Sequence, residues 1–345
     1  MTARHLVVDL MSTVPHMRMP SWVADQLRDD VLDGWRLTII SSPSVSVGSG
    51  RNAASNETIA AIADAEVYFG YGVPEQLIEA AARLKWAHSM AAGVGGSISP
   101  AMRERGLLFT NSAGQYAEGI ADTVLGGVIH FLRGLDIAVR QQAASTWDQT
   151  TFPLDSTNLR EIDECRVLVV GAGGIGSAVA RRFSALGCTC TGVRRRPELG
   201  RPAGFGRVVG PAMLESELRT ADVVVLTAPS TEATNQLLDG ARLALLPLGA
   251  IVVNVARGSL VSEESLVEAL DAGRIRGAVL DVFRTEPLPP DSIWWQHPRV
   301  LITPHVSGVS PRRQWERALE LFEDNWRRWV AGDPLRNVVD LDAGY

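Results

Sequence analysis

The chain has 345 residues, of which 46% are hydrophobic and 21% are charged, and its formal net charge is −6. This length allows two domains of ordinary size, and the balance of residue types is that of a soluble globular protein. The negative charge gives no bulk attraction to phosphates, so nucleic acid is not expected as a partner. The three cysteines form no disulfide framework, which favours a reducing, cytoplasmic location.

Neither a membrane segment nor a metal site is expected. The start, MTARHLVVDLM, lacks a basic stretch followed by a long apolar run, so it does not resemble a signal peptide. The most apolar stretch, 120–132, is too short and too polar to cross a bilayer, and it predicts a buried helix. Cys188 and Cys190 could form a metal pair, but no histidine or second cysteine pair accompanies them, and buried strand cysteines are favoured.

The first part of the chain predicts a small α/β unit. Short apolar runs at 5–9, 36–40 and 66–70 alternate with polar, helix-like stretches, a pattern typical of parallel strands. Two more apolar segments, 84–90 and 107–110, follow.

Within the first part, the segment 41–56 is rich in Ser, Gly and Asn and predicts a loop. From Tyr116 to Arg133 apolar residues repeat every four positions, which predicts a helix with Gly134 as its stop. A polar stretch then runs to about Asp163.

The second part repeats the alternation of strands and helices. A glycine turn after the first of its strands opens a helix to about Leu186, and Ser262 can start a helix that runs to Ala272. Such alternation predicts a doubly wound parallel sheet. The expected strands are 166–170, 188–193, 223–227, 251–255, 277–281 and 300–303.

The last helix carries an aromatic stripe. Ser310 can cap it, and Pro311 suits its first position. The stripe could bind a partner, but packing against the first unit is favoured, because a terminal helix normally docks on its own domain. The stripe consists of Trp315, Leu319, Phe322, Trp326 and Trp329.

The sequence therefore predicts an α/β protein of two Rossmann-like, doubly wound domains with a cleft between them. The substrate (catalytic) domain is discontinuous and comprises residues 1–115 and 309–345. The dinucleotide-binding domain comprises residues 116–308.

The segment VLVVGAGGIG carries the motif G-x-G-x-x-G. Gly171 makes the tight turn, Gly173 lets the backbone approach a pyrophosphate, and Gly176 allows close packing of helix and strand. Gly174 and Ile175 lie at the helix N-terminus, where free N–H groups can face the phosphates. An apolar strand before the turn and a helical pattern after it favour a dinucleotide site over a turn without ligand.

The end of the second strand of this unit bears on the choice of cofactor. NAD sites usually place an acid here for the ribose hydroxyls, whereas this chain has Arg194, Arg195 and Arg196 and no acid before Glu198. Arginine suits a 2′-phosphate through its charge and its forked donors, so NADPH is favoured over NADH. A solvated basic turn that tolerates either cofactor is the alternative.

Three separated residues predict the chemistry. Arg257 can pair with the carboxylate and the carbonyl oxygen of a 2-keto acid, and His305 can give a proton to that oxygen while hydride arrives at carbon. Glu286 can fix the orientation of the imidazole and favour its charged form. Each residue alone has an ordinary structural explanation, as a surface arginine, a loop acid or a buried histidine. The three local contexts together favour catalysis.

These segments resemble a known family. ARGSLVSEESLVEAL, GAVLDVFRTEPLPP and WWQHPRVLITPHVSG resemble signature segments of the D-isomer-specific 2-hydroxyacid dehydrogenases, and GAGGIGSAVARRF and YAEGIADTVLGGVIHFLR resemble their cofactor turn and interdomain helix. The resemblance covers most of 84–332 and is weak over 1–80. The Gly-Val-Arg turn and IWWQHPRV are similar to the glyoxylate/hydroxypyruvate reductase branch, which often uses NADPH.

The resemblance implies further site residues. The family's Arg, Glu and His correspond to Arg257, Glu286 and His305. Its carboxylate-binding loop matches HSMAAGVGG, which implies substrate contacts at Ala92, Gly93 and Val94, although Gly95 stands where the family often has Asp. Tyr71 is a candidate for a pocket wall. Cofactor contacts are implied at Ala228, Pro229, Val255, Ala256 and Asp281, the last of which could instead be a structural acid at a strand end.

The expected activity is NADPH-dependent reduction of a small 2-keto acid, such as glyoxylate or hydroxypyruvate, to a D-2-hydroxy acid. One alternative is an NAD-dependent dehydrogenase of a larger 2-hydroxy acid. Another is a corepressor-like protein that senses dinucleotides, since such relatives can retain the three residues. Family members are usually dimers through the cofactor domain, so a homodimer is expected.

Overall fold

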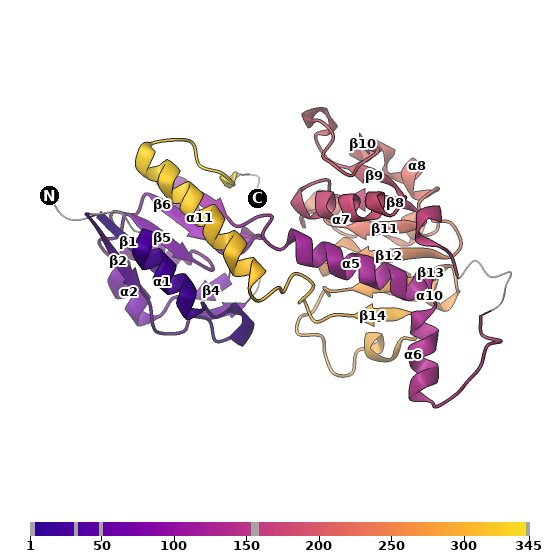
Figure 1. The fold of residues 1–345 in the computed structure, drawn as a ribbon. Helices are drawn as coiled ribbons and strands as arrows, with labels where there is room; N and C mark the ends of the chain where they lie inside the picture. The colour runs from indigo at the N-terminus through magenta and orange to yellow at the C-terminus, as the bar shows by residue number, and fades with distance from the viewer. Residues whose placement is uncertain (1–3, 31–33, 48–50, 153–158, 343–345) are drawn as a thin grey trace. The chain divides into compact units, whose positions relative to one another are not determined.

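The computed structural model describes residues 4–30, 34–47, 51–152 and 159–342. It divides into two compact units, each with its own parallel sheet (Figure 1). Unit 1 comprises 1–116 and 310–345, and unit 2 comprises 117–309. Unit 1 is therefore made from both ends of the chain.

The sheet of unit 1 has five parallel strands in the order β2-β1-β5-β6-β7. The five strands predicted from apolar runs are confirmed. Their bounds are β1 Arg4–Asp9, β2 Trp35–Ile39, β5 Val67–Gly70, β6 Trp86–Ser89 and β7 Leu108–Asn111.

Helices cover both faces of this sheet. Alternate residues of a strand point to opposite faces, so Leu6 and Val8 pack on one side and Val7 on the other. The first side holds α1 (Ser21–Asp30) and α11 (Arg313–Ala331). The second side holds α2 (Asn56–Ile62), α3 (Glu75–Ala80) and α4 (Pro100–Arg105).

The C-terminal helix α11 packs its aromatic stripe into unit 1, as predicted. The Phe322 ring stacks on Phe69 at 4.2 Å between centroids, and the Trp326 ring meets Trp35 at 4.6 Å. The predicted start is wrong, because α11 begins at Arg313 without a side-chain cap. The backbone N–H of Ser310 donates to the Gln314 side chain, and its carbonyl oxygen accepts the Gln314 N–H, so Ser310 contacts the helix through its backbone.

The prediction of a loop at 41–56 is also wrong in part. Strands β3 (Val45–Val47) and β4 (Arg51–Ala53) pair as a short antiparallel hairpin, and α2 starts at Asn56. The abundance of Ser, Gly and Asn concealed a two-stranded ladder only three residues long. Residues 48–50 lie outside the described residues.

The sheet of unit 2 has seven parallel strands in the order β10-β9-β8-β11-β12-β13-β14. The six predicted strands are confirmed, and β10 (Arg207–Val209) is an additional edge strand of three residues. The other bounds are β8 Arg166–Val170, β9 Thr189–Val193, β11 Val223–Leu226, β12 Ala250–Asn254, β13 Ile275–Leu280 and β14 Val300–Ile302. The predicted doubly wound α/β fold is thus confirmed, while the cleft stays a prediction.

Two long helices, α5 (Ala117–Leu132) and α7 (Gly174–Ala185), lie side by side on one face (Figure 1). The contact of α5 with β13 is very close: a Cβ atom on Gly127 would lie 2.8 Å from the Val279 side chain. The neighbouring residues Ala278 and Leu280 point into the core on the opposite face. That face is covered by α8 (Leu214–Leu218), α9 (Gly240–Leu243) and α10 (Glu263–Asp271).

Helix α6 (Leu135–Ala143) was missed in the polar stretch after Gly134. Gly134 ends α5 as expected, but with φ 65° it is also the residue that precedes α6. A buried ion pair anchors the new helix, because Arg276 of β13 holds Asp136 at 2.6 Å and 3.1 Å. Because an ion pair rather than an apolar face anchors this helix, the apolar pattern of the sequence does not predict it.

The cysteines Cys165, Cys188 and Cys190 are free and buried. Of the pair predicted to lie on a strand, only Cys190 does so, because β9 begins at Thr189. Within the described residues no group of three metal-ligating side chains occurs. None of the described helices is both long and apolar enough to span a membrane.

Candidate active site

The residues predicted to bind the cofactor and act in catalysis gather at one edge of the unit 2 sheet. They follow the carboxyl ends of the strands, where open α/β sheets bind their ligands. The first residue of each segment lies one to three positions after the end of its strand: Gly171 after β8, Arg194 after β9, Ala228 after β11, Val255 after β12, Asp281 after β13 and His305 after β14.

The glycine turn has the shape that a dinucleotide requires. Gly171 has φ 112°, and a Cβ atom on Gly176 would lie 2.1 Å from the Gly171 carbonyl oxygen, so only glycine fits there. A Cβ atom on Gly173 would meet nothing within 4 Å, which leaves open space before the N-terminus of α7. Gly174 is exposed and Ile175 half-buried in the first turn of α7. The turn fits a pyrophosphate, held by the free N–H groups of α7.

The three arginines after β9 are accessible. The backbone N–H of Arg194 donates to Val209 O at 3.0 Å, which ties the turn to β10. The Arg194 residue is half-buried, whereas Arg195 and Arg196 are exposed. The turn thus presents positive charge at the carboxyl end of β9.

The segment after β11 adjoins the glycine turn, and the segment after β12 follows the next strand of the sheet. Thr227 donates its hydroxyl to Gly171 O at 2.7 Å, which fixes the end of β11 beside the turn. Pro229 is exposed, whereas Ala228, Val255 and Ala256 are buried. Contacts of these four residues with a cofactor stay predictions.

The side chain of Asn254 fixes the backbone at Arg257. The buried Asn254 donates its amide to Arg257 O at 2.9 Å and accepts from the Ala256 N–H at 3.1 Å. The Arg257 side chain is half-buried, and its Nη1 donates to Ala256 O at 2.6 Å. Burial lowers the pKa of the guanidinium, and the charge of Glu286 opposes this shift. Since arginine stays protonated even so, the result is a weakly hydrated cation near an acid.

Glu286 and His305 are in direct contact. The His305 Nδ1 lies 2.7 Å from the Glu286 Oε2, and Glu286 Oε1 accepts the Phe283 N–H at 2.9 Å. The side chain of His305 is 42% exposed and that of Glu286 is 36% exposed, so the other ring nitrogen of His305 has access to a ligand. The structure therefore brings all three predicted residues together, although successive members are 29 and 19 positions apart in the sequence.

Asp281 organises the segment that carries His305. Its carboxylate is buried, and its Oδ1 accepts from Thr303 Oγ1 at 2.6 Å and from the N–H groups of Val306 and Ser307 at 2.9 and 3.0 Å. Oδ2 accepts from the Ser307 hydroxyl. The recorded partners of the carboxylate all belong to this segment, and a cofactor contact at Asp281 stays a prediction.

The predicted substrate loop lies in unit 1, directly after β6. Asn111 donates its amide to Ala92 O at 2.9 Å, and Gly93 is half-buried. The Val94 side chain is only 2% exposed and belongs to the core, so any substrate contact there is a backbone contact. Tyr71 is also a core residue: its ring is buried and its hydroxyl donates to Met17 O.

Comparison with known proteins agrees with this geometry. Residues 125–307, more than half of the chain, match the model of the D-isomer specific 2-hydroxyacid dehydrogenase, NAD binding domain. The chain belongs to this family. It is therefore an NAD(P)-dependent D-2-hydroxyacid dehydrogenase, and the matched span contains the glycine turn and the three residues Arg257, Glu286 and His305.

Related proteins cover nearly the whole chain. A Corynebacterium melassecola protein from the proB 3′ region is 30% identical over 84% of this chain and 93% of its own length. A family protein from Aeromonas salmonicida is 27% identical, with a TM-score of 0.79, over 99% of this chain and 100% of its own. A dehydrogenase from Xanthobacter autotrophicus, in complex with NADPH and MES, is 27% identical, with a TM-score of 0.78 and the same coverage.

The sequence analysis of this dehydrogenase missed several supporting residues. Asn254 fixes the backbone of Arg257, and Thr303 and Ser307 donate to Asp281. Asn254 could have been noticed as the one polar residue of the apolar strand AIVVN. Thr303 and Ser307 carry no such signal, because their partner is distant in sequence.

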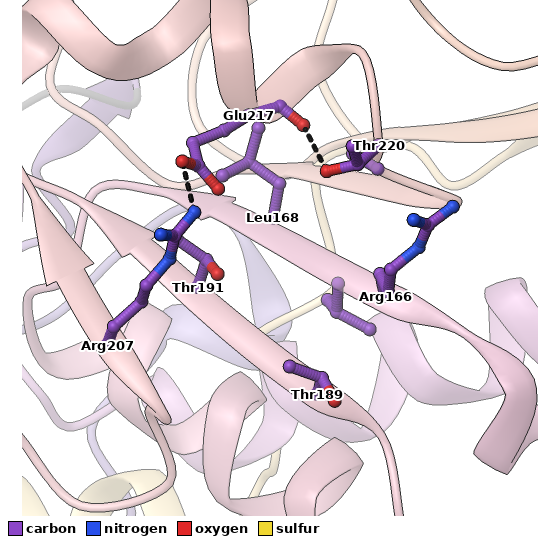
Figure 2. Close-up of a pocket in the computed structure, with 9 residues that line it drawn as sticks. Arg166, Leu168, Thr189, Thr191, Arg207, Glu217 and Thr220 are labelled. Atoms are coloured by element: carbon purple, nitrogen blue, oxygen red, sulfur yellow. Dashed lines mark hydrogen bonds and ion pairs between the residues drawn. The ribbon is translucent and has the colours of Figure 1, made fainter.

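A hollow also lies at the opposite, amino edge of the same sheet (Figure 2). Arg166, Thr189 and Arg207 line it from the first positions of β8, β9 and β10. Figure 2 shows Glu217 directed at Arg207, with which it forms an ion pair, and Arg166 is paired with Asp222. Because its charged groups are paired within the protein, the hollow adds nothing to the candidate active site.

Proposed function

We propose that this dehydrogenase reduces a small 2-keto acid, glyoxylate or hydroxypyruvate, to the 2-hydroxy acid, which has the D configuration where it is chiral, with NADPH as the reductant. The observation that carries the proposal is the 2.7 Å contact between His305 Nδ1 and Glu286 Oε2 beside the half-buried Arg257. This arrangement offers a proton donor, a group that orients the donor, and a cation for the substrate.

Each side chain has one role in the reaction. Arg257 binds the substrate carboxylate and stabilises negative charge on the carbonyl oxygen. Because Nδ1 of His305 is engaged with Glu286, Nε2 donates the proton to that oxygen. The nicotinamide supplies the hydride that reaches the carbonyl carbon. One keto acid, one reduced nicotinamide and one proton thus give one hydroxy acid and the oxidised cofactor.

NADPH is preferred in this proposal because of Arg194, Arg195 and Arg196. An NADH site would need an acceptor for the ribose hydroxyls at this turn, and the chain offers guanidinium donors instead. The forked guanidinium matches the oxygens of a 2′-phosphate. Backbone contacts at Ala228, Pro229, Val255, Ala256 and Asp281 complete the proposed cofactor site.

The first unit supplies the substrate loop in this proposal. Backbone N–H groups of Ala92, Gly93 and Val94 bind the substrate carboxylate, so residues 1–115 and 309–345 form the substrate domain. The support for this role is the resemblance of HSMAAGVGG to the family's loop.

The enzyme acts as a homodimer, with α6 at the interface. Leu135, Val139 and Trp147 on and after α6 are 45%, 57% and 89% exposed. Apolar side chains exposed together mark contact surfaces, and most oligomers are symmetric dimers of one chain. The three free cysteines suit a cytoplasmic location, where thiols stay reduced.

A panel of 2-keto acids, each assayed with NADPH and with NADH, tests the proposal. Oxidation of the reduced nicotinamide is followed by absorbance, and the largest kcat/KM is expected for glyoxylate or hydroxypyruvate with NADPH. Glycolate is achiral, so chiral analysis applies to the glycerate formed from hydroxypyruvate, which should be the D-isomer. Tight cofactor binding without turnover of any keto acid would support a dinucleotide sensor and refute the reductase.

A further inference from the structure

The turn that carries Glu286 is fixed at several points. Glu286 Oε1 accepts the Phe283 N–H at 2.9 Å, and the Phe283 side chain is buried in the unit 2 core. These contacts fix the beginning of the turn and one oxygen of the acid. They leave the backbone at Arg284, two residues before Glu286, to be held by another group.

Glu263 is that group. Its Oε1 accepts the Arg284 N–H at 2.9 Å, across 21 positions of the sequence. Glu263 is the first residue of α10, and its charge also suits a helix N-terminus. The helix is, however, already capped by Ser262, whose hydroxyl accepts the Ser265 N–H. The contact with Arg284 therefore serves the turn rather than the helix.

A second contact joins the turn to the segment after Arg257. A Cβ atom on Gly258 would lie 2.0 Å from the Phe283 carbonyl carbon, so the two backbones touch and only glycine fits between them. The segment 257–263 thus begins with Arg257, the cation of the site, and ends with Glu263, whose carboxylate holds the turn that carries Glu286. Arg257 and Glu286 are supported by one continuous piece of chain.

We propose that Glu263 is a positioning residue, which holds the Arg284 backbone so that Glu286 stays aligned with His305. The inference rests on the proposed function, since it assigns Glu263 to the support of that catalytic group. Arg284 is exposed, so water can replace the lost acceptor and the fold should survive substitution of Glu263.

The test compares Glu263→Ala, Glu263→Gln and Glu264→Ala. For Glu263→Ala, loss of a hydrogen bond to a charged acceptor predicts a kcat about 10- to 150-fold lower. Glu263→Gln keeps an acceptor oxygen and should restore most of kcat.

Glu264→Ala is the matched control. Glu264 is the neighbouring acid on α10, is exposed, and contacts the Arg284 side chain at 3.4 Å rather than its backbone. It should leave kcat unchanged. Wild-type kinetics in Glu263→Ala overturn the proposal, as do equal losses in Glu263→Ala and Glu263→Gln with a lowered melting temperature.

A second measurement separates this inference from the proposed function. Imidazole resonances of His305, assigned with His305→Asn, report the Nδ1 hydrogen bond without any turnover. A change in them in Glu263→Ala, but not in Glu264→Ala, supports positioning even if the wild type reduces no keto acid. An unchanged His305 signal in Glu263→Ala overturns it.

Discussion

His305 has a backbone conformation that residues other than glycine rarely adopt. Its φ is 54°, in the left-handed region, where strain of about 1–3 kcal/mol persists only if neighbours enforce it. The enforcing neighbour is Asp281, whose backbone oxygen accepts the His305 N–H at 2.9 Å and whose carboxylate holds the residues on either side. The strain thus accompanies a fixed direction of the imidazole toward Glu286.

Replacement of His305 with Asn should remove the proton donor and leave the rest of the site intact. A general acid contributes about 10²- to 10⁴-fold, so kcat should fall by that factor. NADPH affinity, measured by titration calorimetry, should be retained because the glycine turn is untouched. An unchanged kcat would exclude His305 from proton transfer.

Replacement of Arg194 and Arg195 with Gln should discriminate between the cofactors. Loss of the guanidinium charges removes partners of a 2′-phosphate, so the Kd for NADPH should rise more than the Kd for NADH. Arg219→Gln, at an exposed position after α8, serves as the control. Equal losses for both cofactors would contradict the assignment of a 2′-phosphate site.

At the scale of elements, the buried pair of Arg276 and Asp136 decides whether α6 stays docked on β13. Both residues are under a tenth exposed, and the Arg276 guanidinium also lies 5.5 Å from the Phe131 ring. Arg276→Met leaves Asp136 with only the more distant Arg140 at 3.3 Å among its recorded partners. Removing one partner of a buried pair costs about 3–5 kcal/mol, which denaturant unfolding can measure.

A double-mutant cycle with Asp136→Asn provides the control for this prediction. If the ion pair is the cause, the second substitution should add much less than its effect in the wild-type background. Additive losses would show that the two residues act separately.

The sequence predicted those strands and helices whose own residues show a regular pattern of apolar positions. Buried strands such as β8 and β12 are runs of apolar residues, and their alternation with helices gave the sheet type. Helix α6 and strand β10 could not be predicted, because α6 depends on Arg276, far along the chain, and β10 has only three residues. The hairpin β3–β4 was lost for the same reason of length.

The site shows the same division. Arg257, Glu286 and His305 were found because their segments resemble family signatures. Asn254 and Glu263 were not found, because they act on backbone groups that any residue offers. Their positions become meaningful only when the fold brings those groups within hydrogen-bond distance.

At the scale of the whole molecule, His88 makes unit 1 sensitive to acid. It is fully buried, with Thr110 Oγ1 at 2.7 Å and Ser112 Oγ at 3.1 Å from its ring nitrogens. Burial lowers the pKa of His88 to about 3, whereas an unfolded histidine has a pKa of about 6.5. Between pH about 3 and about 6.5 the imidazole of His88 is therefore protonated in the unfolded state and neutral in the folded state.

The sign of the effect follows from this difference. Below pH about 6.5 the stability of unit 1 should fall by about 1.4 kcal/mol per pH unit, down to the pKa of the folded state. The variant His88→Gln should lack this contribution, so the wild type should lose more stability than the variant between pH 7 and pH 4. Parallel pH dependences in chemical denaturation would refute a neutral buried imidazole.

The contribution of α11 to unit 1 has a consequence for synthesis. Phe322 stacks on Phe69 and Trp86, at 4.2 and 5.5 Å between ring centroids, yet it is translated after all of unit 2. On the ribosome, unit 2 can finish folding while the nascent sheet of unit 1 still presents a bare aromatic face. Exposed apolar surface of this kind is prone to aggregation and is the kind of surface that chaperones bind. It stays exposed until α11 emerges and covers it.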